Sequence, residues 1–190
     1  MAFSARSAHE VGPNPLARAA AAHAGPLVDL TVSNPTEVGL TYDRETIMAA
    51  LSDPLLLVYR PEPLGLGSAR TAVAAEYADL GATVDPARIV ITASTSEAYA
   101  YLLSLLCDPG DDVLVPAPGY PLLTELAQLA GVRLRPYDLE FDGAGFGFDP
   151  APIARTLGAR TRAIVVVAPN NPTGTTLSRE DLAAIDAFGV

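Results

Sequence analysis

The second half of the chain alternates between short apolar runs and longer segments with helical spacing. The apolar runs cover residues 88–92, 112–115, 132–137 and 162–167, and each has the length of a single strand. Strands that are apolar along their whole length are typical of parallel sheets covered by helices on both faces. The alternation therefore predicts an α/β fold with a mostly parallel sheet.

Helices are expected between these strands and after the last one. Residues 97–107, 120–130 and 150–157 have helical spacing, and glycine or proline follows the first two segments. A capping box formed by Ser178 and Asp181 opens the final helix. The glycine-rich segment between the third strand and the third helix is interpreted as a flexible turn, at residues 143–147.

The first part of the chain has a different character. We interpret residues 1–48 as an N-terminal arm with a connecting segment, and residues 49–190 as the first part of a large layered domain. Within the arm, residues 16–24 predict a short helix and residues 28–32 a brief extended piece.

The region around residue 50 combines helical segments with one rigid loop. Residues 44–51 predict a helix with Asp43 as its N-cap. Prolines and glycines are dense in residues 59–67 and force a loop. Ser68 is expected to cap a helix that runs to about Leu80.

Composition limits the classes of function. With 190 residues and 49% hydrophobic content, the chain can bury one substantial core. A net charge of −10 argues against a nucleic-acid or anionic-membrane partner, which would require an excess of basic residues. All 12 basic residues are arginines, so the chain contains no lysine.

Neither metal chemistry nor export is indicated. His9 and His23 lie apart from any cysteine or acidic cluster at ligand spacing, so no metal site is expected. Cys107 lies in an apolar helical pattern, which favours a buried structural thiol. The start of the chain lacks the apolar core of a secretory signal, and no stretch reaches the ~20 apolar residues of a membrane span. We expect a cytoplasmic protein.

Candidate chemistry gathers after the strands, because ligands of open α/β sheets bind at the carboxyl ends of the strands. Residues 93–98, Ala-Ser-Thr-Ser-Glu-Ala, place small residues and hydroxyls at a helix start. Free N–H groups and the helix dipole make such a start an anion site. Ordinary N-capping by serine or threonine explains the same pattern equally well.

Two further loops offer contacts for a flat ligand. Tyr120 follows the second strand and can stack on a ring, although it can equally cover the core. The loop after the fourth strand contains Asn170 and Asn171, whose amides can donate to a phenolate oxygen or tie up their own turn.

Together these segments resemble the class I/II, fold type I, pyridoxal-phosphate-dependent aminotransferases. The motifs keep the order and spacing of that family across residues 28–185. They are Tyr59-x-Pro61 with Gly65 and Arg70, Thr92 to Ala98, Pro109 to Val115, Pro118-Gly119-Tyr120-Pro121 and Pro169-Asn170-Asn171-Pro172-Thr173-Gly174. The resemblance implies the aspartate aminotransferase-like large domain, incomplete at its C-terminus.

The resemblance also implies roles around the cofactor, pyridoxal 5′-phosphate. Ser94, Thr95 and Ser96 would hold its phosphate, with Ser94 standing where glycine is frequent in the family. Tyr120 would stack on the pyridine ring. Asn171 would donate a hydrogen bond to the phenolic oxygen of the ring.

Other implied roles concern the substrate and a second subunit. Tyr59 would reach across a homodimer interface to the phosphate in the neighbouring subunit. Asn34 and Pro35 fall in the loop that borders the substrate carboxylate, which is a weaker carry-over.

Three groups that the family's chemistry needs lie beyond the Asn-Pro-Thr-Gly loop. They are a Schiff-base lysine, an aspartate that pairs with the pyridinium nitrogen, and an arginine for the substrate carboxylate. The chain ends at Val190 without any lysine. We therefore expect an N-terminal fragment that has no catalytic residue of its own and is inactive alone. In this view the family's later strands would lie between the strand at 88–92 and the other three.

The resemblance predicts a transferase of amino-acid metabolism or biosynthesis, acting in its full form on an amino acid and a 2-oxo acid as a homodimer. The alternatives are a lyase or decarboxylase of the same fold, a non-catalytic module that binds pyridoxal phosphate or another ligand, and a gene remnant.

Overall fold

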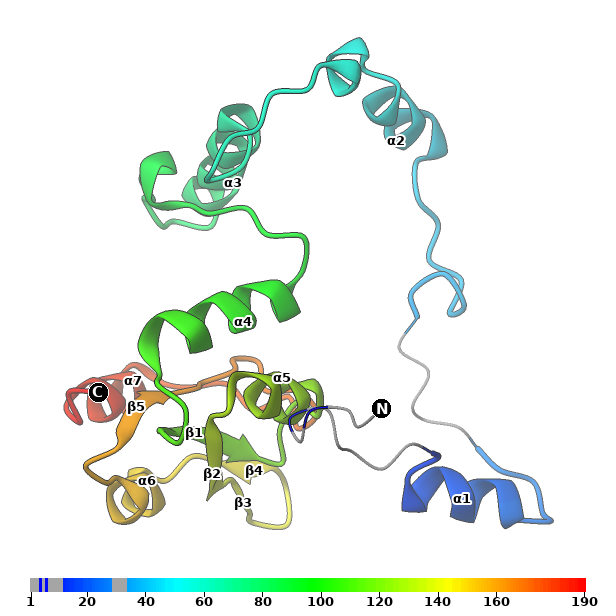
Figure 1. The fold of residues 1–190 in the computed structure, drawn as a ribbon. Coiled ribbons are helices and arrows are strands. Elements are labelled where there is room, and N and C mark those ends of the chain that lie inside the picture. Colours follow the sequence, from blue (N-terminus) through cyan, green and yellow to red (C-terminus); the bar gives the residue numbers. More distant parts are fainter. Residues whose placement is uncertain (1–3, 5, 7–11, 29–33) are drawn as a thin grey trace. The chain divides into compact units, whose positions relative to one another are not determined.

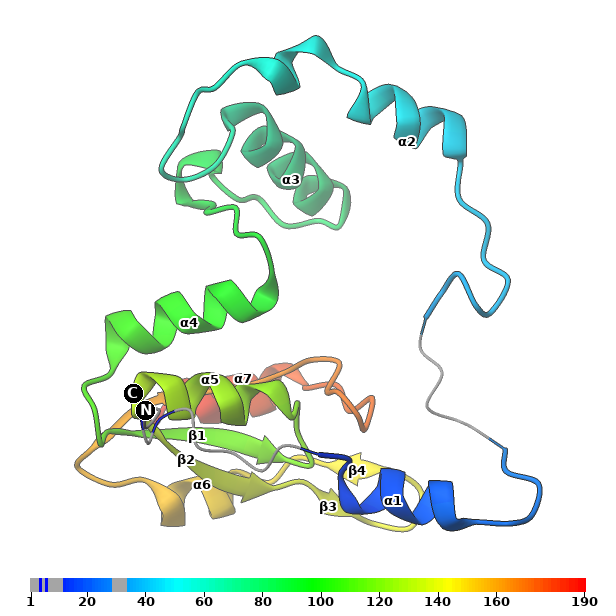
Figure 2. The ribbon, with the colours of Figure 1, turned by 45° about the vertical axis from the view of Figure 1, so that its right-hand side comes forward.

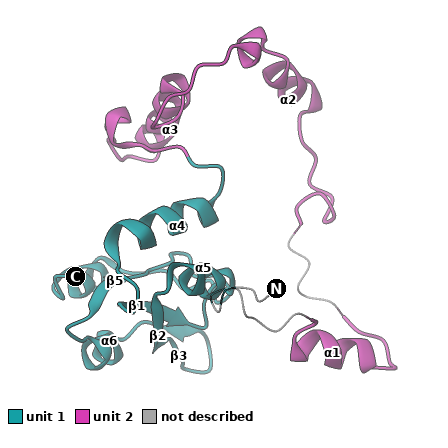
Figure 3. Ribbon diagram, in the orientation of Figure 1, with its two compact units in different colours: residues 1–8, 92–190 teal, residues 9–91 magenta. Residues whose placement is uncertain are grey.

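The chain forms two compact units. The structure, a computed structural model, describes residues 4, 6, 12–28 and 34–190. Unit 1 comprises residues 1–8 and 92–190, and unit 2 comprises residues 9–91 (Figure 3). The division at residue 48 that the sequence suggested concerns the domains of a complete enzyme and stays a prediction.

Unit 1 is built on a three-stranded parallel sheet (Figure 1). Its strands are β1 (Asp112–Ala117), β2 (Arg133–Asp138) and β5 (Thr161–Ile164), in the order β2-β1-β5. Both pairings of the central strand β1 are parallel. The predicted α/β fold with a parallel sheet is thus confirmed, although the last strand ends earlier than its apolar run.

Helices cover both faces of this sheet. Figure 2 shows α5 (Leu122–Ala130) on one face and α6 (Pro150–Thr156) on the other. On the first face, α5 and α4 (Thr95–Leu106) pack with the sheet around Leu103, Val113, Ala127 and Val132.

The opposite face has its own core. Successive residues of a strand point to opposite sides of the sheet, so Val113 and Leu114 serve the two different cores. The second core is made of Leu114, Tyr137, Leu139 and Ile153, with Ile185 from α7 (Arg179–Asp186) packed against it.

Several helix boundaries follow the signals in the sequence. Gly131 ends α5 in the left-handed conformation, with φ of 72°, and its N–H donates to the Ala127 carbonyl. Ser178 and Asp181 form the predicted capping box at the start of α7. The predicted helix at 150–157 is α6.

The expected strand at residues 88–92 is absent from the described part of the chain. Residues Pro86–Arg88 form a 3₁₀ turn, η3, and the segment after it pairs with no strand. The Ile91 N–H of this segment donates a hydrogen bond to the carbonyl of Leu64, 2.9 Å away, in the preceding loop. An apolar run becomes a strand only where a neighbouring strand pairs with it, and none of the described residues supplies one.

The glycine-rich segment at 143–147 includes the turn of a hairpin. It closes an antiparallel hairpin of β3 (Glu140–Phe141) and β4 (Phe146–Gly147). The Asp142 carboxylate accepts from the N–H groups of Ala144 and Gly145, at 2.8 and 2.9 Å. The segment thus forms a turn, as interpreted, and the Asp142 side chain is the acceptor for two of its N–H groups.

Unit 2 consists of short helices and connecting segments. They are α1 (Pro15–Ala22), α2 (Arg44–Leu51), the 3₁₀ turn η2 (Pro54–Leu57), α3 (Gly67–Asp79) and η3. None of the described residues of unit 2 is buried. The predicted extended piece at 28–32 lies outside the described residues except for Val28.

Helix starts in unit 2 show which cap predictions hold. Asp43 caps α2 by accepting from the Thr46 N–H at 3.1 Å, as predicted. The expectation that Ser68 caps α3 was wrong, because this helix begins at Gly67 and its N-cap, Leu66, makes no side-chain bond. Instead, the Glu62 carboxylate accepts from the Gly67 N–H at 2.9 Å.

Candidate functional site

A hollow of about 300 Å³ lies in unit 1, where the chain leaves the carboxyl ends of its strands. Its apolar floor comes from the face of the sheet that α4 and α5 cover, including Val115, Leu134 and Val165. Two tyrosines, Tyr99 of α4 and Tyr120 of the loop after β1, contribute aromatic walls. This volume is at the lower end of the range for ligand pockets.

Tyr120 is placed by a tight loop after β1. Gly119 is required there, because a Cβ at this position would collide with the carbonyl oxygen of Pro116. The close approach turns the chain sharply and directs the next residue to the hollow. Tyr120 is 38% exposed, so part of its surface is accessible to a ligand.

The start of α4 separates the two interpretations of residues 93–98. Ser94 is the N-cap, and its hydroxyl accepts from the Glu97 N–H at 3.2 Å. The N–H groups of Thr95 and Ser96 open the helix and have no acceptor within it. Ser94 therefore acts as an ordinary cap, while the next two residues keep free donors at a helix N-terminus.

Glu97 fastens this helix start. Its carboxylate accepts from the Ala93 N–H at 2.6 Å and from the Tyr101 hydroxyl at 2.9 Å. The Ala93 N–H, and after it the Tyr101 hydroxyl, lowers the pKa of the Glu97 carboxyl below its ordinary value. Both oxygens of this negative group are thus held by the chain itself.

The two asparagines of the loop after β5 have different environments. Asn170 is 5% exposed, and its side-chain oxygen accepts from the hydroxyl of Thr173 at 2.9 Å. Asn171 is exposed. Of the two roles that the sequence left open, Asn170 ties up its own turn, and Asn171 keeps an accessible amide.

The structure places Thr95, Tyr120 and Asn171 in unit 1 but only Tyr120 at the hollow. Tyr120 lines the hollow, whereas Thr95 and Asn171 are not among its lining residues. Thr95 lies one helical turn before Tyr99, which does line it. Asn171 follows four residues after Val167, which also lines it.

Three predicted residues lie in the other unit. Tyr59 is 92% exposed, and Asn34 accepts from the N–H and hydroxyl of Thr36 at 3.1 and 2.7 Å. Pro35 is exposed beside it. Because they belong to unit 2, the implied roles of Tyr59, Asn34 and Pro35 stay predictions.

Sequence reasoning missed Tyr99, and from the residues alone it left open which of the two roles Asn170 has. Tyr99 follows Thr95 by four residues, and this spacing on a helix could have shown that both lie on one side of α4. No local signal distinguishes Asn170 from Asn171, because both are asparagines within one turn; only the family resemblance singled out Asn171.

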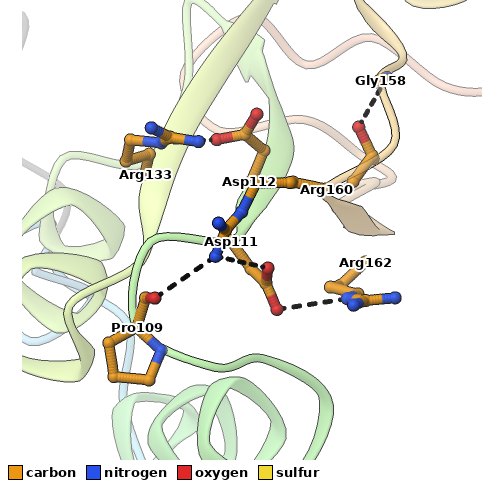
Figure 4. A network of polar contacts seen from close by, with 8 residues as sticks. Pro109, Asp111, Asp112, Arg133, Gly158, Arg160 and Arg162 are labelled. Carbon is orange, nitrogen blue, oxygen red and sulfur yellow. Dashed lines mark hydrogen bonds and ion pairs between the residues drawn. The ribbon is translucent and has the colours of Figure 1, made fainter.

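A polar cluster lies at the amino ends of the strands, opposite the hollow (Figure 4). Asp111, only 2% exposed, accepts from the Asp108 N–H at 2.9 Å and pairs with Arg160 and Arg162 at 3.2 and 3.1 Å. The Asp108 N–H and then Arg162 lower the pKa of the Asp111 carboxyl. This cluster joins the start of β1 to the start of β5 and lies at the amino ends of the strands, away from the hollow.

Known proteins with similar sequences are aminotransferases. A probable N-succinyldiaminopimelate aminotransferase of Mycobacterium tuberculosis is 36% identical over 132 residues, covering 67% of this chain and 33% of that protein. A glutamate-pyruvate aminotransferase of Haemophilus influenzae is 33% identical over 162 residues, covering 84% and 39%. The chain thus spans between a third and two fifths of the length of these relatives.

Solved structures agree. The N-succinyldiaminopimelate aminotransferase structure from Mycobacterium tuberculosis matches with a TM-score of 0.69 and 31% identity, over 77% of this chain and 38% of that one. An aminotransferase from Escherichia coli matches with a TM-score of 0.74 and 29% identity, over 87% and 41%. The family model for class I and II aminotransferases matches residues 31–188. The chain belongs to the class I and II aminotransferase family.

Proposed function

We propose that this chain supplies the phosphate and ring contacts for pyridoxal 5′-phosphate in an enzyme that transfers an amino group between an amino acid and a 2-oxo acid. Class I and II aminotransferases depend on this cofactor in general. The observation that carries the proposal is the accessible ring of Tyr120 at a hollow beside α4. The relatives named above are all aminotransferases, which favours this function over a lyase or decarboxylase.

The start of α4 fits the phosphate. A helix of 12 residues directs its positive end toward an anion, and Thr95 and Ser96 add two N–H groups and two hydroxyls. In the described part of the chain these two hydroxyls form no hydrogen bond. The neighbouring carboxylate of Glu97 is already engaged by Ala93 and Tyr101.

The hollow and the loop after β5 fit the ring. The face of Tyr120 offers a stacking surface for a flat aromatic group. Val115, Leu134 and Val165 form an apolar wall, which excludes water and strengthens polar contacts at the rim. The amide of Asn171 is available to donate to the phenolic oxygen of the ring.

These residues bind and orient, and the cofactor supplies the chemistry. When bound, pyridoxal phosphate acts as an electron sink for negative charge at the substrate carbon that carries the amine. The chain has no lysine side chain, so no side chain of these 190 residues can hold the cofactor as an imine. The lysine that moves the proton of this substrate carbon in the family is likewise not among them. We therefore assign no catalytic residue within this chain.

The same proposal includes features of the complete enzyme. In a homodimer, Tyr59 would contact the phosphate of the neighbouring subunit, and Asn34 with Pro35 would border the substrate carboxylate. The exposure of Tyr59, at 92%, supports an intermolecular role. A cytoplasmic location is likewise part of the proposal. No helix in the described residues is long and apolar enough to cross a membrane.

Calorimetric titration of the chain with pyridoxal phosphate and with phosphate-free pyridoxal tests the proposal. We expect the phosphate to improve affinity at least about tenfold, as charge-assisted hydrogen bonds would. Replacing both Thr95 and Ser96 by alanine removes the part of that gain that comes from the two hydroxyls and leaves the part from the backbone N–H groups. Ser104→Ala on the same helix, whose hydroxyl only donates to the Ala100 carbonyl, leaves it unchanged. Equal affinity of the unmodified chain for both ligands would refute the proposal.

A further inference from the structure

Four of the hydrogen bonds that close the loop after β5 involve Asn170. Its N–H donates to the Thr175 carbonyl at 2.8 Å, and its carbonyl accepts from the Gly174 N–H at 2.7 Å. Its side-chain oxygen accepts from the N–H and hydroxyl of Thr173, at 3.3 and 2.9 Å. The buried Asn170 is therefore bonded to residues on the far side of the turn, and Asn171 to Thr173 lie between these bonded positions.

One hydrogen bond, made by Thr175, ties this loop to the β3–β4 hairpin. The hydroxyls of Thr173 and Thr175 lie 2.7 Å apart, and the Thr175 hydroxyl donates to the Phe146 carbonyl at 3.1 Å. Phe146 is itself partly buried against the core of Leu114 and Tyr137. We call Asn170, Thr173, Thr175 and the Phe146 carbonyl the loop clasp.

The base of the loop is fixed in the same way. The buried hydroxyl of Tyr137 donates to the Val165 carbonyl at 2.9 Å, directly after the end of β5. The chain between Val165 and Thr175 is thus held at its start and at its end. The amide of Asn171 lies between these two anchors and is exposed to a ligand.

We infer that Asn170 and Thr175 are positioning residues that hold the Asn171 amide in the orientation needed for the ring oxygen of the cofactor. The inference rests on the proposed function. A side chain on a loop fixed before binding loses less conformational entropy when it binds, so its hydrogen bond contributes more to affinity. In this proposal the hairpin at 140–147 supports the loop, because the Phe146 carbonyl accepts the hydrogen bond of Thr175.

The test compares two probes that differ only at the ring oxygen. Pyridoxine 5′-phosphate has the phenol and no aldehyde, so it forms no imine with the terminal amine. Its 3-O-methyl ether blocks the same oxygen. We expect the unmodified chain to prefer the phenol about tenfold, because one good hydrogen bond to a charged oxygen has about that effect. Asn171→Ala reduces the preference to about one.

The clasp variants then decide the inference. Thr175→Val removes one hydroxyl at constant shape, and Asn170→Ala removes the central acceptor; both bring the preference close to one while the phosphate contribution remains. Thr176→Val is the matched control, since no described residue bonds to the hydroxyl of this exposed neighbour. It keeps the full preference.

Failure of the inference and failure of the proposed function give different results. A chain that binds both probes equally before any substitution lacks the ring contact, which overturns the proposed role of Asn171 together with the inference. If Asn171→Ala abolishes the preference but Thr175→Val and Asn170→Ala retain it, only the inference is overturned. The inference alone is also overturned if circular dichroism shows that Thr175→Val unfolds unit 1, because Thr175 is then needed for the fold itself.

Discussion

Removal of one buried hydroxyl, in Tyr137→Phe, tests how the sheet holds the loop after β5. Tyr137 is 2% exposed, and its hydroxyl donates to the Val165 carbonyl at 2.9 Å. Its ring contacts Phe148 edge to face, with ring centres 6.3 Å apart. Phenylalanine keeps this packing, so the substitution isolates the hydrogen bond between β2 and the segment after β5.

The expected loss of stability at neutral pH is about 1–3 kcal/mol, because the Val165 carbonyl keeps its half-buried position and loses a partner. The exposed Tyr101, whose hydroxyl donates to Glu97, provides the matched control. Tyr101→Phe should change the free energy of unfolding by less than about 0.5 kcal/mol, as is usual for surface sites.

A second consequence appears in alkali. Burial raises the pKa of Tyr137 to about 12, from 10.0 for an exposed tyrosine. The unfolded chain therefore releases this proton at lower pH than the folded chain does, and stability falls as the pH rises from 10 toward 12. Two pKa units correspond to about 2–3 kcal/mol over that interval. Tyr137→Phe lacks this contribution.

Urea unfolding followed by far-ultraviolet circular dichroism, at pH 7 and at steps between pH 9 and 12, measures both effects. We expect a lower midpoint for Tyr137→Phe at pH 7 and a smaller loss of stability in alkali than in the unmodified chain. Identical midpoints at pH 7 together with identical alkaline slopes would show that the hydroxyl is not held as described.

Two other side chains allow similar tests. Asp111→Asn should lower the urea midpoint at neutral pH. Because the pKa of Asp111 in the folded chain is lowered from 3.8, the variant should also lose less stability than the unmodified chain when the pH falls below that value. An equal loss of stability in acid for both chains would contradict this role. Burial raises the pKa of the Cys107 thiol from 9.0, so at pH 8 iodoacetamide should alkylate Cys107 of the folded chain more slowly than free cysteine, and at the rate of free cysteine once urea has unfolded the chain. Alkylation of the folded chain as fast as free cysteine would contradict this.

The sequence predicts those elements whose signals are local or repeated. The apolar runs that became β1, β2 and β5 lie together in a sheet because each finds a neighbour within unit 1. The equally apolar run at 88–92 does not become a strand, since strand formation needs a pairing partner that local sequence cannot guarantee.

The candidate site was predictable in its parts and less so in its geometry. Tyr120 could be predicted from Gly119 and the flanking prolines, which dictate a tight turn after a strand. The difference between Asn170 and Asn171 could not, because it depends on Thr173 and on the turn that closes around it. The role of the 140–147 hairpin depends on a bond between residues 29 positions apart, Thr175 and Phe146, which no local pattern reveals.

The central claim is that the start of α4, the loop after β1 and the loop after β5 bind one phosphorylated ring. The most direct measurement is a titration of the ¹⁵N-labelled chain with pyridoxine 5′-phosphate, followed by amide chemical shifts. The account predicts that the backbone signals of Thr95, Ser96 and Tyr120 and the side-chain amide of Asn171 move together, with one dissociation constant. Saturable shifts at only one of these three segments, or signals that move with unrelated affinities, would contradict it.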